Sequence, residues 1–274
     1  SEVESAFVPA IIIVLLIDQP LLDCYRHEID ALRIFGGLTM TSTSEKSDEY
    51  EHLRMQWSTI TSNQIDHFGR FLNVLKNYEE MGTPEHLLPI MASLFRLRED
   101  FVEFVPEFVA ILAQLHTFYV DNVERDFEFI VFWLFFGLLT KTGVIEMVRE
   151  RKMIEKIGNS LFSFLSLHPI LSDLLEREDS KWKDFAARII LSLFVGLVPQ
   201  ESIGRFWISM LSCGDPMDFL RAAIASSLIL MYPQIIHVEN TSERIIEGLQ
   251  EHFRTYPIQL VISDSLKLMS AMNR

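Results

Sequence analysis

Two short pairs of side chains have the types and spacings that could do chemistry. Cys24 and His27 lie three residues apart, which would place a thiol and an imidazole on one helix face as nucleophile and base. Glu49 and His52 have the same spacing and could offer a carboxylate and an imidazole to a metal. The first pair has no orienting third group, and a di-iron site needs a second Glu-x-x-His and two further Glu. We therefore interpret both pairs as chance neighbours and predict no catalytic residue, no metal site and no cofactor.

The sequence also lacks the short motifs that mark common nucleotide-binding and hydrolase sites. GxxxxGK[ST], GxGxxG, GxSxG and HExxH are all absent. The two cysteines, Cys24 and Cys213, are far apart and have no zinc-ligand spacing, so we expect two buried thiols in a reducing compartment. The motifs therefore predict a protein that is not itself an enzyme.

The composition is that of a globular protein rich in helix. The chain has 274 residues, of which 49% are hydrophobic and 23% charged, with only 11 Gly and 10 Pro. A formal net charge of −14 repels phosphate backbones and disfavours nucleic acid and anionic membranes as partners. The apolar runs Ala6–Ile17 and Phe129–Leu139 are shorter than the ~20 residues of a membrane span, so we expect core helices there. The acidic flank of the first run does not fit a signal peptide.

Hydrophobic periodicity predicts helices along nearly the whole chain, with no strand alternation and no fixed-period repeat. We expect an all-α fold without a sheet, in a single domain over 1–274 for which 1–140 and 141–274 are candidate subdomains. The polar stretch Thr39–Ser47 is expected to form a mobile loop. The expected helices are 5–17, 21–35, 49–60, 64–80, 84–97, 100–120, 126–140, 143–156, 159–176, 182–196, 200–212, 216–232, 241–253 and 257–272.

The segment Trp182–Met231 carries the clearest pattern, because three helical stripes follow one another there with short breaks. Pro199 permits a tight restart after the first stripe, and Cys213–Pro216 separates the second from the third. The third helix is apolar on nearly all sides, which is typical of a central, buried helix. The first two stripes consist of Trp182, Phe185, Ala186, Ile189, Ile190, Leu193 and Phe194, then Ile203, Phe206, Trp207, Met210 and Leu211.

This segment resembles the C-terminal half of a TBC domain, the all-helical fold of Rab GTPase-activating proteins. That family shows Leu-Pro-x-Glu, then Arg-x-Trp-Asp, a Gly break, and a helix similar to Leu-Phe-Arg-x-Ala-x-Ala. The clearest departure is Ile208, which stands where the family has Asp. The matching residues here are Val198–Glu201, Arg205–Trp207, Gly214 and Phe219–Ala225, with weaker likenesses at Tyr25-Arg26, Phe132–Leu134 and Leu167–Leu171.

The resemblance implies two catalytic fingers in an active member, an Arg from Ile-x-x-Asp-x-x-Arg and a Gln from Tyr-x-Gln. An arginine finger is worth ~10³–10⁵ in rate, so its loss decides the function. No Asp-x-x-Arg in this chain has the preceding Ile, and Tyr232-Pro233-Gln234 is expected to follow the terminal helix, in the wrong order. We infer that both fingers are missing. The three Asp-x-x-Arg sequences end at Arg26, Arg33 and Arg221.

A TBC domain without fingers implies an adaptor rather than a GTPase activator. Such a chain is similar to the short TBC subunits of the tuberous sclerosis (TSC) complex, which bind the coiled coil of hamartin and support activation of Rheb by tuberin. The resemblance implies a coiled coil or amphipathic helix as partner, a cytoplasmic location and recruitment to endolysosomal membranes through partners. Two alternatives remain open: an active Rab GTPase activator that uses Arg26 or Arg33, and an unrelated α-helical scaffold.

Candidate residues for partner binding are apolar side chains on an otherwise polar expected helix. Met55, Trp57 and Ile60 meet this criterion within 49–60. A partner helix laid against them would be anchored at i, i+3 or i+4, and i+7. Trp57 also fits a core anchor, because large aromatic side chains are mostly buried.

Overall fold

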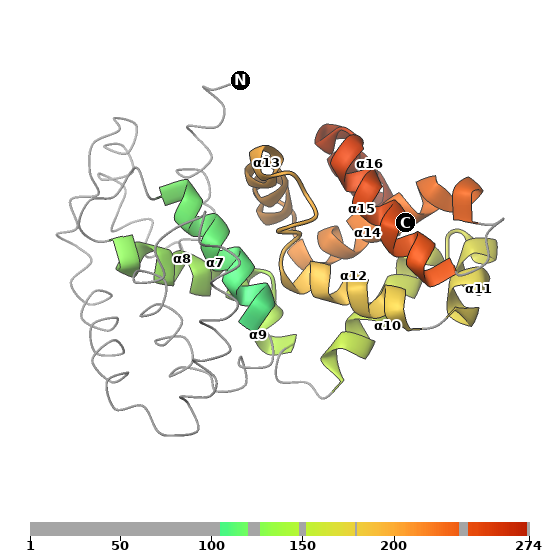
Figure 1. Cartoon of the computed structure of the whole chain (residues 1–274), viewed down its shortest axis with the longest axis horizontal. Helices are drawn as coiled ribbons and strands as arrows, with labels where there is room; N and C mark the ends of the chain where they lie inside the picture. The colour runs from blue at the N-terminus through green and yellow to red at the C-terminus, as the bar shows by residue number, and fades with distance from the viewer. Residues whose placement is uncertain (1–104, 120–126, 148–151, 179, 236–240, 273–274) are drawn as a thin grey trace. The chain divides into compact units, whose positions relative to one another are not determined.

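The computed structural model describes residues 105–119, 127–147, 152–178, 180–235 and 241–272 (Figure 1). These ranges are mainly helical, and the only strand-like pairing within them is an isolated bridge between Val195 and Val198. The predicted all-α class is therefore confirmed for this part of the chain. The chain divides into two compact units, Ser1–Lys141 and Thr142–Arg274, and each is described by itself.

In the first unit, α7 (Val105–Tyr119) packs against α8 (Phe127–Lys141). The rings of Phe108 and Phe135 are both fully buried and meet edge to face, with 6.1 Å between their centroids. The apolar run Phe129–Leu139, which is predicted as a core helix, lies within α8. Among the described helices, none is both long and apolar enough to cross a membrane.

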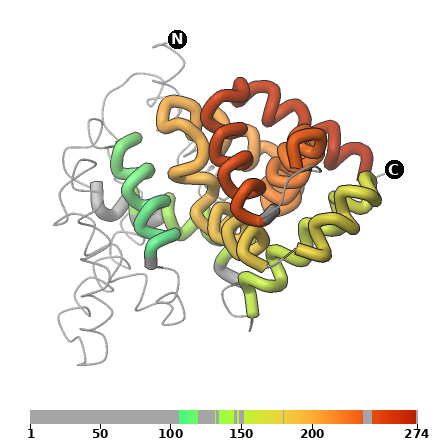
Figure 2. The backbone as a smooth tube through the Cα atoms, turned by 45° about the vertical axis from the view of Figure 1, so that its right-hand side comes forward, coloured from blue at the N-terminus to red at the C-terminus, as the bar shows by residue number. Residues whose placement is uncertain are grey.

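The second unit contains the remaining described helices, and its core surrounds one of them. α14 contacts five others, namely α10, α12, α13, α15 and α16, and lies among them in both backbone views (Figures 1 and 2). Its central position confirms the prediction from its apolar sequence. In chain order the helices are α9 (Val144–Met147), α10 (Met153–Leu165), α11 (Pro169–Arg177), α12 (Lys181–Leu191), α13 (Gln200–Leu211), α14 (Pro216–Ile235), α15 (Thr241–Thr255) and α16 (Ile258–Met272).

The prediction of a single helix over 159–176 is wrong, because α10 ends at Leu165 and α11 begins at Pro169. Pro169 has no N–H to donate and disfavours helical backbone in the residue before it. His168 accordingly lies outside the helix, and its Nδ1 accepts a hydrogen bond from the backbone N–H of Leu171 at 3.3 Å. An imidazole thus caps α11, with proline at the first helical position.

Two further predicted helices have the wrong bounds. The helix predicted over 143–156 does not continue through Lys152, which has φ of +60°, and α10 begins at Met153 and runs past 156 to Leu165. The helix predicted over 182–196 ends at Leu191, because Leu193 and Phe194 both have positive φ. Left-handed backbone at non-glycine residues is costly, and periodicity alone gives no sign of it.

α10 and α12 approach each other closely at one glycine. A Cβ added to Gly158 would lie 2.8 Å from the Lys183 Cβ and 3.3 Å from the Lys183 carbonyl oxygen. These atoms belong to or adjoin the α12 backbone and cannot easily move aside. The missing side chain at Gly158 therefore allows α10 to lie against α12.

Candidate functional site

The residues that the sequence singled out as sites all lie outside the described residues, as does the loop expected over 39–47. They stay predictions without a structural account. They comprise the finger candidates Arg26 and Arg33, the partner-binding residues Met55, Trp57 and Ile60, and the pairs Cys24 with His27 and Glu49 with His52.

The segment Trp182–Met231, by contrast, is described in full, and its apolar stripes form the core of the second unit. All five residues of the second stripe are buried. In the first stripe Phe185 and Ile189 are half-buried and the other five are buried. Phe206 links the segment's elements, since its ring lies 4.8 Å from that of Phe194 and 5.3 Å from that of Phe219.

A buried corner connects the first two stripes. Leu193 and Phe194 have φ of +51° and +66°, and the Phe194 N–H donates to the Ile189 carbonyl at 2.9 Å, which closes α12. The indole N–H of Trp207 donates to the Leu193 carbonyl at 2.8 Å. This hydrogen bond fastens α13 to the strained corner and pairs a carbonyl that would otherwise be costly to bury.

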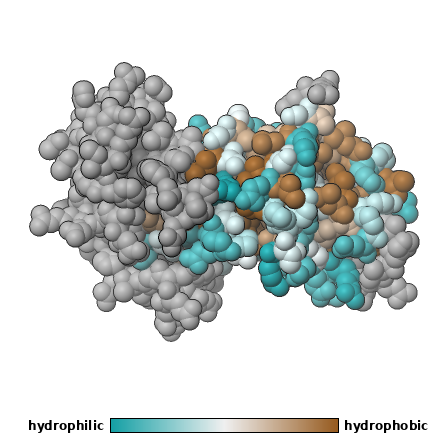
Figure 3. Space-filling model, turned by 90° about the horizontal axis from the view of Figure 1, so that it is seen from above, coloured by the Kyte–Doolittle hydropathy of each residue, from teal (hydrophilic) through white to brown (hydrophobic). Residues whose placement is uncertain are grey.

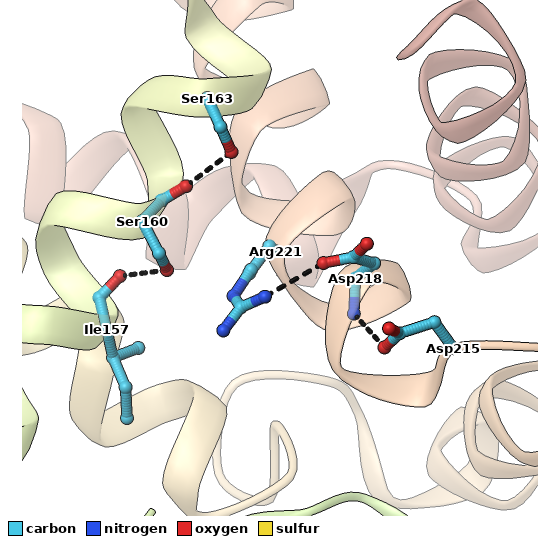
Figure 4. A network of polar contacts seen from close by, with 6 residues as sticks. All are labelled: Ile157, Ser160, Ser163, Asp215, Asp218 and Arg221. Carbon is cyan, nitrogen blue, oxygen red and sulfur yellow. Dashed lines mark hydrogen bonds and ion pairs between the residues drawn. The ribbon is translucent and has the colours of Figure 1, made fainter. Parts of the chain in front are cut away.

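The third Asp-x-x-Arg lies at the start of α14, where Asp218 interacts with both Asp215 and Arg221 (Figure 4). Asp215 caps the helix, because its carboxylate accepts a hydrogen bond from the Asp218 N–H at 2.9 Å, and Pro216 follows at the first helical position. The Arg221 guanidinium donates through Nη1 to Asp218 at 2.8 Å, and its side chain is only 20% exposed. Arg221 thus forms an ion pair with a residue of its own helix.

The guanidinium of Arg221 points from α14 toward α10, on the side of Ser160 (Figure 4). Its Nε is buried and has no hydrogen-bond partner. Ser160 and Ser163 donate instead to carbonyls three residues earlier on α10, those of Ile157 and Ser160, both at 2.7 Å. The two serine hydroxyls therefore donate to carbonyls of their own helix, and the Arg221 Nε stays unpaired.

Tyr232-Pro233-Gln234 lies inside α14, which corrects the prediction that it follows the helix. α14 extends to Ile235 and includes Pro233 in its last turn. Gln234 is exposed, whereas the half-buried Tyr232 ring lies 4.6 Å from the His168 ring. Pro233 has no N–H to donate to the carbonyl four residues earlier, and burial of Met231 and Ile235 on either side of it holds this turn in place.

The surface of the second unit carries apolar areas beside polar ones (Figure 3). Exposed apolar surface on a folded chain is the usual mark of a protein contact when it is contiguous. Leu167 and Ile170 flank the cap of α11, and two exposed leucines lie on α16. The large hydrophobic side chains exposed among the described residues are Leu167 (50%), Ile170 (67%), Leu230 (47%), Leu260 (45%) and Leu266 (41%).

Two titratable groups with shifted pKa values, His252 and Tyr256, lie where α15 meets α16. Burial lowers the pKa of His252, and the nearby Asp264 carboxylate opposes that shift. The His252 ring stacks on Tyr256, whose hydroxyl donates to Asp264 at 3.3 Å. Burial, followed by Asp264, raises the pKa of Tyr256. Lys267 donates to the other Asp264 oxygen at 2.9 Å, so the carboxylate already has two partners.

Two expectations about ligating groups can be compared with the structure. Cys213 is a free thiol that is half-buried rather than buried, and desolvation raises its pKa, which disfavours the reactive thiolate. Over the residues that the structure describes, no group of three His, Cys, Asp or Glu is placed to hold a metal ion.

Comparison of the chain with protein-family models, with curated proteins and with solved structures found no match. The TBC resemblance therefore depends on the residues of the chain itself, above all those of Trp182–Met231.

Proposed function

We propose that this chain is a non-catalytic TBC-like adaptor, which binds a helical or coiled-coil partner and stabilises a complex that regulates a small GTPase. One observation carries the proposal: the motif residues of Trp182–Met231 follow the family's order, and the apolar ones among them build a single core. A fold whose framework is retained without its catalytic groups is typical of a protein that acts by binding.

The state of Arg221 supports the non-catalytic part of the proposal. A finger must reach out to the phosphate of another protein, but Arg221 is mostly buried and bound to Asp218. Gln234, in the only Tyr-x-Gln of the sequence, belongs to the last turn of α14. The finger candidates that remain are Arg26 and Arg33, and neither has the family's preceding Ile.

The partner proposed from the resemblance is a coiled coil or an amphipathic helix, as hamartin provides in the TSC complex. The regulated GTPase would then be activated by another subunit, as tuberin activates Rheb. Met55, Trp57 and Ile60 remain the partner-binding residues proposed from sequence.

A GTPase assay tests the proposal against the catalytic alternative. GTP hydrolysis by a panel of GTP-loaded Rab proteins is measured with the wild type, with the double variant Arg26→Ala/Arg33→Ala, and with Arg70→Ala as a control outside any Asp-x-x-Arg. We expect no stimulation by any of the three. Stimulation by the wild type and by Arg70→Ala, lost in the double variant, would replace the adaptor by an active Rab GTPase activator.

A pull-down with the full chain, followed by mass spectrometry, tests the partner class. Recovery of a long coiled-coil protein is expected. Recovery of only a GTP-bound Rab contradicts the adaptor proposal, and experimental coordinates with a regular superhelix of helix pairs would favour an unrelated α-helical scaffold.

A further inference from the structure

The short helix α11 is held by little packing. It has nine residues, of which only Leu171 and Leu175 are buried, and among the described helices it packs chiefly against α10. Helices of this length are marginal in water, so the group that pairs the first free backbone N–H contributes much to their stability. A small chemical change at the start of α11 can therefore loosen its first turn.

The group at the start of α11 is the imidazole of His168, and its hydrogen bond identifies the protonation state of the ring. The Leu171 backbone N–H donates to Nδ1 of His168 at 3.3 Å. A ring nitrogen that accepts a hydrogen bond carries no proton, so this imidazole is neutral and has its hydrogen on Nε2. An imidazolium has a hydrogen on both nitrogens and accepts no hydrogen bond. The cap therefore exists only while the ring is neutral.

The charges around His168 oppose its protonation or lie far from it. The N-terminus of a helix carries a partial positive charge, which disfavours a cation there. Asp173, the carboxylate of α11 nearest in sequence, lies five residues on and is exposed, so water screens its attraction. α10 and α14 have their charged residues in their first two turns, whereas His168 follows the end of α10. The charged residues of the three helices are Glu155 and Lys156 on α10, Asp173, Glu176 and Arg177 on α11, and Asp218 and Arg221 on α14.

The second neighbour of the imidazole is the aromatic ring of Tyr232, near the end of α14. The two ring centroids are 4.6 Å apart and the rings are tilted by 58°. The face of a tyrosine ring attracts a cation as well as a neutral ring, so this contact persists when His168 gains a proton. Protonation therefore acts on the cap of α11 and not on the contact with α14.

We propose that His168 is a pH-sensitive cap, which holds the first turn of α11 while its imidazole is neutral and releases this turn when the imidazole is protonated. Histidine side chains change their charge between about pH 5 and 8, so mild acid is sufficient. The released turn contains Leu171, which is fully buried, beside Ile170 and Leu167, which are 67% and 50% exposed. Acid therefore enlarges the apolar surface where α10 meets α11.

Hydrogen–deuterium exchange of the full chain tests the proposal. Exchange is measured at pH 7.5 and 5.5 in the peptide that contains Leu171, for the wild type, for His168→Asn and for His168→Ala. Asn caps helices through an amide oxygen that does not titrate in this range, whereas Ala has no acceptor. The ratio of two chains at one pH cancels the intrinsic pH dependence of exchange, and His252 is present in all three chains.

We expect the wild type and His168→Asn to exchange alike at pH 7.5, and the wild type to exchange about fivefold faster at pH 5.5, as the loss of one cap implies. His168→Ala should exchange about fivefold faster than His168→Asn at both pH values. If His168→Asn lowers the urea midpoint of unfolding at pH 7.5, His168→Asp replaces it with the same expectation, since its carboxylate also accepts the Leu171 N–H throughout this range.

Three results would overturn the proposal. The first is a ratio of wild type to His168→Asn that is the same at pH 7.5 and 5.5, and the second is a wild type that exchanges as fast as His168→Ala at pH 7.5. The third is a nitrogen-15 NMR spectrum at pH 7.5 in which the His168 ring proton lies on Nδ1. All of these measurements use the chain without a partner, so their outcome is independent of the adaptor function.

Discussion

α14 and α16 are both apolar helices of the second unit, yet they differ in how their surfaces are covered. α14 has 20 residues, of which 13 are buried, and five other helices contact it. α16 has 15 residues, of which three are buried. Neighbouring helices therefore cover the apolar residues of α14 more completely than those of α16, which contacts α10, α13 and α14.

The difference separates two roles that one kind of sequence can serve. Around α14 the apolar residues supply the hydrophobic free energy of the core, so their loss should lower stability. On α16 Leu260 and Leu266 stay 45% and 41% exposed, so they add less hydrophobic free energy to the core. Substitutions in the two helices should therefore lower stability by different amounts.

The largest effect is expected from a cavity beside the centre of the core. Leu228 of α14 is fully buried, and Leu228→Ala removes apolar volume that the surrounding helices can replace only partly. We expect a loss of about 2–5 kcal/mol in the free energy of unfolding, measured by urea denaturation. A loss below about 1 kcal/mol would mean that α14 is not the central helix described here.

A smaller effect is expected at the buried corner that connects α12 to α13. Trp207→Phe removes the indole donor to the Leu193 carbonyl and leaves that oxygen unpaired, so we expect a loss of about 1–3 kcal/mol. Trp182→Phe is the matched control, because Trp182 is equally buried but its indole N–H has no hydrogen-bond partner. Equal losses in the two variants would show that volume, and not the hydrogen bond, secures the corner.

The helices of this core follow from the sequence wherever periodicity decides them. The stripe from Ile203 to Leu211 is buried as predicted, and α15 begins at Thr241, where the predicted helix begins. The errors fall where single residues override periodicity. Pro169 ends α10 before its apolar pattern ends, and Leu193 adopts a left-handed backbone that the Trp207 hydrogen bond stabilises.

The exposure of Leu260 and Leu266 on α16 could not be predicted from the sequence. The apolar residues of this helix fit a buried helix as well as a partly exposed one, because periodicity gives the direction of a face and not the presence of a neighbour. The residues chosen from sequence, such as Trp57, lie outside the described ranges and stay predictions. The Asp-x-x-Arg pattern that ends at Arg221 can be recognised in the sequence. Only the structure shows that its Asp218 and Arg221 form an ion pair within one helix.

A fall in pH should destabilise the region where α15 meets α16. Because burial lowers the pKa of His252, the folded chain binds fewer protons there than the unfolded chain, whose pKa is about 6.5. This stability is present above the unfolded pKa and is lost as the pH falls through it. Between pH 7.5 and 5.5 we expect the urea midpoint to fall further in the wild type than in His252→Gln, and equal falls would assign the pH dependence to other groups.

The smallest effect on stability is expected at Leu266 of α16. Leu266→Asp should change the free energy of unfolding by no more than about 0.5 kcal/mol, because the side chain is already 41% exposed and the buried residues of α16, Ile258, Val261 and Ser265, are unchanged. Urea denaturation of this variant beside Leu228→Ala places both helices on one scale. A loss comparable to that of Leu228→Ala would mean that α16 needs Leu266 for folding, and the contrast between a covered and a partly open helix would disappear. A near-zero loss would show that the exposed apolar surface of α16 contributes little to the core.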